Sequence, residues 1–347
     1  QMFEGINLEG TKIEESPILE VKNLRKFFPV QKGILRKIVG QVRAVDDVSI
    51  SINKGETVSI VGESGCGKTT TARCIMRAID PTSGEIKFNT KNGEIIDLAS
   101  LSRDEVRPYR DDIQMIFQDP FSSLNPRMTL FDIVGEPLLV NGMKNRKERE
   151  DRVAELMGQV GLRPEYMQRF PHAFSGGQRQ RIGIARALSI KPSLIVADEP
   201  VSALDVSVQA QVLNLMMDLQ DQLNLTYLFV SHDLSVVSQI SDRVVVMYVG
   251  KVVETGTPKE IFESPRHPYT AALATSLPKA DPRLKQERIV LQGEVANPSD
   301  PPSGCYFHPR CPYATDICKT ETPELKQIGN GRTVSCHRID EINLPGV

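Results

Sequence analysis

The chain of 347 residues is 40% hydrophobic and 25% charged, a composition typical of a globular protein with one large domain and room for a smaller one. Its formal net charge of −2 argues against a protein that coats nucleic acid, because it gives no diffuse positive field. With no run of about 18 apolar residues, and no basic start followed by an apolar stretch, we expect neither a membrane-spanning helix nor a secreted protein.

Short apolar runs alternate with helical stretches from Ile18 to about Val253, which is the pattern of a layered α/β domain. Buried strands are predicted at 58–61, 194–197 and 226–230, and a strand with a hairpin that closes the core at 244–253. A helix is expected over 69–79, and a mostly helical region over about 119–188. The polar residues that follow the strands should lie together at the carboxyl edge of the sheet.

The residues after the first of these strands match the phosphate-binding pattern G-x-x-x-x-G-K-[ST] completely, between a strand and a helix. They are Gly62, Glu63, Ser64, Gly65, Cys66, Gly67, Lys68 and Thr69. Such a loop turns N–H groups toward the phosphates of a nucleoside triphosphate, and the helix N-terminus adds positive potential. Lys68 is predicted to reach the β- and γ-phosphates of ATP, the Thr69 hydroxyl to bind Mg²⁺, and Thr70 to complete the contacts.

Cys66 within this loop has two interpretations. It is either a tolerated loop residue or, because a thiol at a helix N-terminus can be acidified, a site that alkylating agents attack in the nucleotide-free protein.

The strand at 194–197 ends in two adjacent carboxylates, Asp198 and Glu199. Asp198 is predicted to hold Mg²⁺ through its water shell, and Glu199 to polarise the water that attacks the γ-phosphate. Acidic pairs are usually only solvated, so this assignment depends on the phosphate loop.

A phosphate loop predicts that a protein binds a nucleoside triphosphate, but kinases, GTPases, helicases and transporters all have one. A second motif narrows the class of protein. The pentapeptide Phe174, Ser175, Gly176, Gly177 and Gln178 resembles the signature sequence of the ABC ATPase family, although a serine cap on a glycine turn is its simpler interpretation. The resemblance covers residues 18–262. It implies that two such domains pair head to tail and that the signature of each closes over the ATP of the other.

Four more residues take roles from this resemblance. Gln118 matches the glutamine loop, which senses the γ-phosphate and Mg²⁺ and faces the membrane subunits. Asp205 closes the loop 202–205 that couples the two ATP sites, and His232 matches the switch histidine, which contacts the γ-phosphate and the attacking water. Phe28 matches the aromatic that stacks on adenine, with Phe27 as the fallback and a core position as the alternative.

Two stretches, 117–128 and 267–278, resemble the ATPases of bacterial oligopeptide and dipeptide permeases. This implies an ATP-hydrolysing subunit that energises peptide import at the cytoplasmic face of the cell membrane. Its expected partners are a second ATPase subunit, paralogous or identical, two transmembrane permease subunits and an extracellular substrate-binding protein, with no nucleic acid.

Three alternatives stay open beside peptide import. Related nickel and glutathione importers share much of this sequence. A non-transport ABC ATPase that acts on nucleic acid or ribosomes is a different class, disfavoured by the absence of a long heptad insertion. A binding module without hydrolysis is disfavoured by the intact Lys68, Asp198, Glu199 and His232.

The predicted organisation is an N-terminal tail (1–17), an ABC ATPase domain (18–262) and a separate, loop-rich, proline-punctuated extension (263–347). The extension holds four of the six cysteines, Cys305, Cys311, Cys318 and Cys336. Their spacing is wider than in structural zinc sites, whereas a [4Fe–4S] cluster tolerates varied spacing. The permease resemblance implies such a cluster in a structural role; zinc and plain reduced thiols are the alternatives.

Overall fold

The structure, a computed structural model, describes residues 16–33, 37–277, 289–329 and 331–346. The predicted N-terminal tail lies almost entirely outside these residues. Within the described ranges, none of the helices combines the length and the apolar character that crossing a bilayer requires.

The core of the fold is an eight-stranded sheet in the order β11-β12-β10-β9-β3-β8-β7-β6, of which β9, β3, β8, β7 and β6 run parallel. Every residue of β3, β7 and β8 is buried, as expected for parallel strands covered on both faces. The three predicted strands and the hairpin are confirmed. The bounds are β3 (Thr57–Val61), β6 (Ile113–Ile116), β7 (Leu194–Asp198), β8 (Thr226–Val230), β9 (Arg243–Tyr248), β10 (Lys251–Gly256), β11 (Lys326–Gln327) and β12 (Thr333–Val334).

A second, antiparallel sheet of four strands has the order β2-β1-β4-β5. Its strands are β1 (Leu19–Lys32), β2 (Lys37–Ile52), β4 (Ser83–Asn89) and β5 (Ile95–Asp97). Helix α1 (Lys68–Ile75) packs between the two sheets, where its Ile75 shares one buried core with Leu19 of β1 and Ile60 of β3.

Helix α1 is shorter than the predicted 69–79. Arg77 adopts a left-handed conformation with φ of 55°, which takes the chain out of the helix. Its guanidinium then donates to the Leu101 carbonyl at 2.9 Å and pairs with Asp80 at 3.2 Å. The turn is therefore held by contacts between segments that the local sequence does not reveal.

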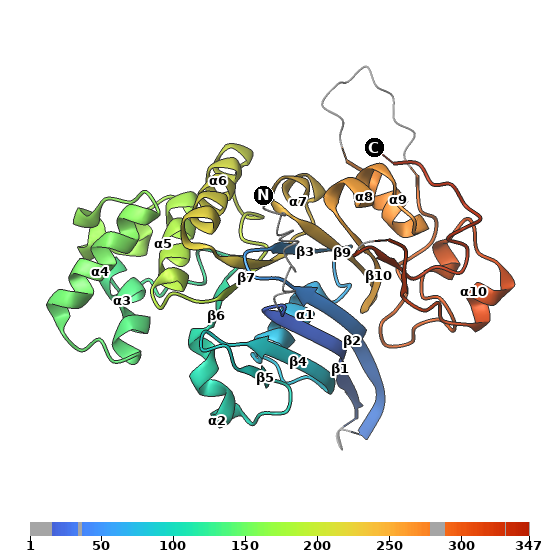
Figure 1. The fold of residues 1–347 in the computed structure, drawn as a ribbon, viewed down its shortest axis with the longest axis horizontal. Coiled ribbons are helices and arrows are strands. Elements are labelled where there is room, and N and C mark those ends of the chain that lie inside the picture. The colour runs from blue at the N-terminus through green and yellow to red at the C-terminus, as the bar shows by residue number, and fades with distance from the viewer. Residues whose placement is uncertain (1–15, 34–36, 278–288, 330, 347) are drawn as a thin grey trace, which may run out of the picture.

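The predicted helical region forms one end of the molecule (Figure 1). Its long helices begin at side-chain caps, Thr129 for α3, Asn145 for α4 and Ser175 for α5. One apolar core joins these helices to α6 and to the face of β7 and β8. The bounds are α3 (Leu130–Val140), α4 (Arg146–Gln159), α5 (Gly176–Leu188) and α6 (Val206–Leu223), with α2 (Arg103–Val106) and α7 (Leu234–Ile240) elsewhere in the domain.

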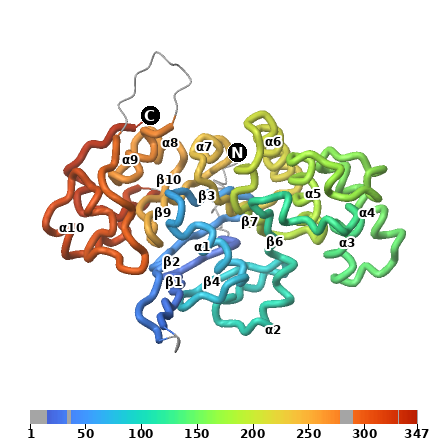
Figure 2. Tube along the Cα trace, turned by 180° about the vertical axis from the view of Figure 1, so that it is seen from behind, coloured from blue at the N-terminus to red at the C-terminus, as the bar shows by residue number. Residues whose placement is uncertain are grey.

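The C-terminal extension lies at the opposite end (Figures 1 and 2). It is loop-rich, as predicted, but it is not separate. Its strand β12 pairs with β10 of the main sheet, and Phe307 shares a core with Tyr248 of β9. Main-sheet pairing and shared apolar burial therefore join the extension to the main domain. Its helices are α9 (Pro268–Ala274) and α10 (Asp316–Thr320), preceded by α8 (Pro258–Glu263).

Candidate active site

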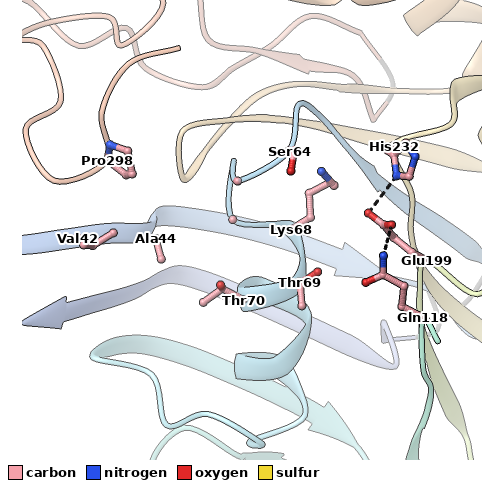
Figure 3. Close-up of a pocket in the computed structure, with 12 residues that line it drawn as sticks. Val42, Ala44, Ser64, Lys68, Thr69, Thr70, Gln118, Glu199, His232 and Pro298 are labelled. Carbon is pink, nitrogen blue, oxygen red and sulfur yellow. Dashed lines mark hydrogen bonds and ion pairs between the residues drawn. The ribbon is translucent and has the colours of Figure 1, made fainter. Parts of the chain in front are cut away.

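A pocket of about 600 Å³ opens at the carboxyl edge of the large sheet (Figure 3). It is lined by Val42, Ala44, Ser64, Gly65, Gly67, Lys68, Thr69, Thr70, Gln118, Glu199, His232 and Pro298. In the close-up, Val42 and Pro298 lie at one end, the phosphate loop in the middle, and Glu199 with its partners at the other. The pocket therefore joins residues from six separated stretches of the chain.

The loop from Gly62 to Gly67 needs glycine at two positions. A Cβ on Gly62 would lie 2.2 Å from the Met247 carbonyl oxygen, and one on Gly67 would lie 2.1 Å from that of Ala44. Gly67 also has φ of 103° immediately before α1. Neighbouring backbone thus holds the loop tightly against the sheet, so that it meets the helix N-terminus in the arrangement that suits phosphate.

Lys68 is the first residue of α1 and is almost fully buried. Its ammonium donates to the carbonyl oxygens of Gly62 at 2.8 Å and Glu63 at 3.1 Å. The loop itself therefore satisfies this charge and holds it at the pocket wall.

Thr69 and Asp198 are brought together behind the phosphate loop. The Thr69 hydroxyl donates to Asp198 Oδ1 at 2.8 Å, and the Arg73 guanidinium lies 3.9 Å from Oδ2. Burial raises the pKa of the Asp198 carboxyl, and the contacts with Thr69 and Arg73 oppose this rise. Thr69 lines the pocket, whereas the buried Asp198 carboxylate does not line it and lies directly behind the Thr69 hydroxyl.

Glu199 stands at the centre of a three-residue cluster. Gln118 Nε2 donates to Glu199 Oε2 at 2.8 Å, and His232 Nδ1 lies 3.1 Å from Oε1 (Figure 3). Glu199 has φ of 49°, a left-handed conformation that is uncommon for a residue with a side chain and is frequent at functional sites. The sequence placed all three residues in one site, and the structure brings them together.

The other end of the pocket is lined by Val42, Ala44 and Pro298. Phe28, the predicted adenine contact, does not line the pocket: it lies on β1 opposite Val42, is 37% exposed, and has the Lys26 ammonium 4.9 Å from its ring centroid. Pro298, which comes from the extension and accepts a hydrogen bond from the Arg43 N–H at 2.8 Å, was missed. No sequence signal linked the two segments.

The signature turn, Ser175 to Gln178, contributes no residue to the lining of this pocket. Ser175 caps α5 in a reciprocal box with Gln178, and Asp205 caps α6 through the Val208 N–H at 3.0 Å. Both residues therefore serve as helix caps in this chain, and their roles across a dimer stay predictions.

The structure favours the first interpretation of Cys66, a tolerated loop residue, over an acidified thiol that alkylating agents attack. Its side chain is only 2% exposed, and burial raises the pKa of the thiol despite the nearby Lys68. Desolvation outweighs the positive potential of the helix N-terminus, so Cys66 is a buried loop residue.

The four cysteines of the extension line one small cavity and form no disulfide. Burial raises the pKa of Cys305 and of Cys311 to about 11 each. The nearby histidines are engaged elsewhere: His308 Nδ1 lies 3.0 Å from the Cys305 carbonyl oxygen and His337 Nε2 lies 2.9 Å from that of Glu321. In the described part of the chain, no three potential ligands lie close enough to hold a single metal ion.

Two family models match the chain. The one described as "ABC transporter" covers residues 45–202, and the one described as "Oligopeptide/dipeptide transporter, C-terminal region" covers residues 253–318. The first range holds the phosphate loop, Gln118, the signature turn and Glu199, and the second holds the first three cysteines of the extension.

Relatives of known name match over nearly the whole chain. The oligopeptide transport ATP-binding protein AppF of Bacillus subtilis is 53% identical, covering 94% of this chain and 99% of that protein. The dipeptide transport ATP-binding protein DppF of Haemophilus influenzae is 49% identical, covering 94% and 98%.

Solved structures show the same fold. The dimeric cassette MJ0796, bound to ADP and Pi, is 31% identical with a TM-score of 0.60, covering 69% of this chain and 98% of that one. The protein cbiO1 from Clostridium perfringens is 28% identical, also with a TM-score of 0.60, covering 71% of this chain and 91% of that one. The chain therefore belongs to the ATP-hydrolysing subunits of ABC transporters, in the branch that carries the oligopeptide and dipeptide transporter C-terminal region.

Proposed function

We propose that this chain hydrolyses ATP to drive import of dipeptides or oligopeptides. The observation that carries the proposal is the single pocket where Lys68, Thr69, Gln118, Glu199 and His232 meet. The peptide substrate is supported by the names of the relatives and by the matching C-terminal region.

The phosphate loop and Lys68 bind the triphosphate in this proposal. Lys68 exchanges its contacts with loop carbonyls for the β- and γ-phosphate oxygens, where its charge is most useful. The Thr69 hydroxyl and the Asp198 carboxylate suit Mg²⁺, because both are oxygen donors and lie 2.8 Å apart beside the loop. Mg²⁺ bound there would neutralise charge on the phosphate oxygens.

Glu199 is the proposed general base. Its carboxylate takes a proton from water as the water attacks the γ-phosphate. Gln118 and His232 each contact one oxygen of this carboxylate and so fix its orientation. His232 is more than half exposed toward the pocket and can also contact the γ-phosphate.

The second ATPase partner is proposed to supply the signature turn. Ser175 opens α5, whose helix N-terminus attracts phosphate, and it lies outside its own chain's pocket. The dimeric state of the MJ0796 cassette supports such pairing, with a copy of this chain or a paralogue as the partner.

Permease subunits are proposed to dock beside Gln118. Phe117 and Phe121, which flank it, are exposed although they are large and aromatic. Arg179 lies 4.2 Å from the Phe121 ring centroid and orients it. Contact there would reach Glu199 through Gln118, at the cytoplasmic face of the membrane. An extracellular binding protein would deliver the peptide.

Reconstitution tests this function. The chain, its ATPase partner and the permease subunits are placed in vesicles with the binding protein, and ATP hydrolysis and peptide uptake are measured together. We expect peptide to stimulate both. Stimulation by a nickel complex or glutathione alone would reassign the substrate, and stimulation by nucleic acid or ribosomes without membrane subunits would refute the transport function.

For the extension, we propose a [4Fe–4S] cluster held by Cys305, Cys311, Cys318 and Cys336. The four thiols line one cavity, and four cysteine thiolates are the usual ligand set of such a cluster. Thiols of raised pKa are protonated at neutral pH, so ligation would release protons. The bound cluster would stabilise the extension.

Anaerobic purification tests the cluster. We expect iron, acid-labile sulfide and visible-range absorbance, all lost in Cys311→Ser and retained in Cys74→Ser, a buried thiol of α1 that serves as the control. Bound zinc, or the absence of any metal from anaerobic protein, would contradict the proposal.

A further inference from the structure

Glu63, inside the phosphate loop, is held by the C-terminal extension at two points. We propose that Tyr269 and Arg310 are positioning residues: they fix Glu63 and so hold the phosphate loop in the conformation that binds the triphosphate. The inference rests on the nucleotide site proposed above and gives the extension a direct part in ATP affinity.

The first contact is an ion pair. Arg310 NH1 donates to Glu63 Oε2 at 2.7 Å and Arg310 NH2 donates to Oε1 at 3.1 Å, which is the two-pronged geometry of strong guanidinium–carboxylate pairs. The Arg310 side chain is 8% exposed and that of Glu63 is 30% exposed. The pair is thus largely shielded from water and links positions 247 residues apart.

The second contact is to the backbone. The Glu63 N–H donates to the Tyr269 hydroxyl oxygen at 2.8 Å. Tyr269 lies on α9 and is fully buried, with its ring centroid 4.8 Å from that of Tyr248 and 5.5 Å from that of Phe307. This hydroxyl is therefore fixed by packing and cannot follow a moving loop.

The carbonyl group of Glu63 connects these two contacts to Lys68, the proposed phosphate-binding residue. Its carbonyl oxygen accepts from Lys68 Nζ at 3.1 Å and from the Cys66 N–H at 3.3 Å. Side chain and N–H of Glu63 are thus held by the extension, while its carbonyl supports the lysine that reaches the phosphates. A shift of Glu63 would move both the loop and Lys68, and would therefore weaken their contacts with the triphosphate.

The neighbouring sequence extends the connection. Arg310 ends a 3₁₀ turn, His308–Arg310, between Cys305 and Cys311. Because His308 of that turn lines the same cavity as the four cysteines, the Arg310–Glu63 pair connects this part of the extension to the phosphate loop.

The test measures ATP affinity and stability side by side. Arg310→Met and Tyr269→Phe are compared with wild type by titration with a fluorescent ATP analogue, by KM and kcat for hydrolysis in the reconstituted transporter, and by thermal unfolding. We expect the Kd and KM for ATP to rise roughly tenfold in Arg310→Met, the scale of a lost charged hydrogen bond, and about threefold in Tyr269→Phe, which loses a neutral one. In both variants kcat should stay within about threefold.

A matched control separates positioning from stability. Arg332 pairs with Glu254 at 2.7 Å, is also 8% exposed, and also joins the extension to the main domain, but it does not touch the phosphate loop. Arg332→Met should therefore lower the melting temperature and leave ATP affinity unchanged. In a double-mutant cycle, Glu63→Gln and Arg310→Met should be non-additive for ATP affinity.

The proposal is overturned if Arg310→Met and Tyr269→Phe lower the melting temperature as the control does but bind ATP like wild type. If Arg310→Met does not fold, the ATP affinities of Tyr269→Phe and Arg310→Lys test the proposal instead. Tyr269→Phe removes only a hydroxyl, and Arg310→Lys keeps the positive charge. Failure of wild type and of Arg332→Met to bind ATP would instead refute the nucleotide site itself.

Discussion

Replacing Glu199 by glutamine removes the proposed base with almost no change in shape. The Gln118 amide and the His232 ring lie 2.8 and 3.1 Å from the two carboxylate oxygens. In Glu199→Gln one of these contacts stays a hydrogen bond, and the Gln118 amide can turn to restore the other. The phosphate loop, Lys68 and Thr69 are untouched.

The size of the effect follows from this geometry. ATP binding should stay within about threefold, because the hydrogen bonds and ion pair of the Glu199 side chain are with Gln118 and His232 and not with the phosphate loop. Turnover should fall roughly 10²–10⁴-fold, the usual worth of a positioned base, which equals about 3–5 kcal/mol in the activation barrier.

The assay is ATP hydrolysis by the reconstituted transporter, with ATP affinity measured on the same preparation. Glu94→Gln is the control, because Glu94 is exposed and lies outside the pocket. Near-normal hydrolysis in Glu199→Gln would refute the assignment, and equal losses of turnover and ATP affinity would point to a collapsed site rather than a missing base.

Three further predictions follow from burial and capping. Native Cys66 should resist iodoacetamide and react only after unfolding; rapid labelling of folded protein would contradict its burial. Because burial raises the pKa of Asp198, its contribution to stability is present below the unfolded value of 3.8 and is lost as pH rises through the folded value. Asp198→Asn should thus melt higher than wild type at pH 7 without Mg²⁺ and lose this advantage near pH 3.8, and a lower melting temperature at pH 7 would refute this. Ser175→Ala should cost about 1 kcal/mol in the free energy of unfolding and reduce transporter turnover roughly tenfold or more, whereas unchanged turnover would leave Ser175 only a helix cap.

The strands and the phosphate site were predictable because their signals are local. The short, continuous apolar runs at β3, β7 and β8 are typical of strands that are buried on both faces of a parallel sheet. The phosphate loop follows β3 and the two carboxylates come at the end of β7, so both must lie at the carboxyl edge of the same sheet. For this reason Lys68, Thr69 and Glu199 could be assigned to one site from the sequence.

The contacts between distant segments were not predictable. Pro298 reaches the pocket, and Arg310 reaches Glu63, only because the extension docks on the main domain. The buried state of Cys66 depends on packing of the loop, whereas the sequence shows only its place before a helix. Docking is decided by the shared core around Phe307 and Tyr248, and no short motif encodes it.

The central claim is a composite site in which two ATPase chains enclose each ATP. A structure of the assembled transporter carrying Glu199→Gln, determined with ATP and Mg²⁺, tests it most directly. We predict that the triphosphate bound to Lys68 of one chain also touches the turn Ser175–Gly177 of the opposing ATPase or its counterpart in a paralogue. Nucleotide enclosed by one chain alone, with the opposing turn facing solvent, would contradict the account.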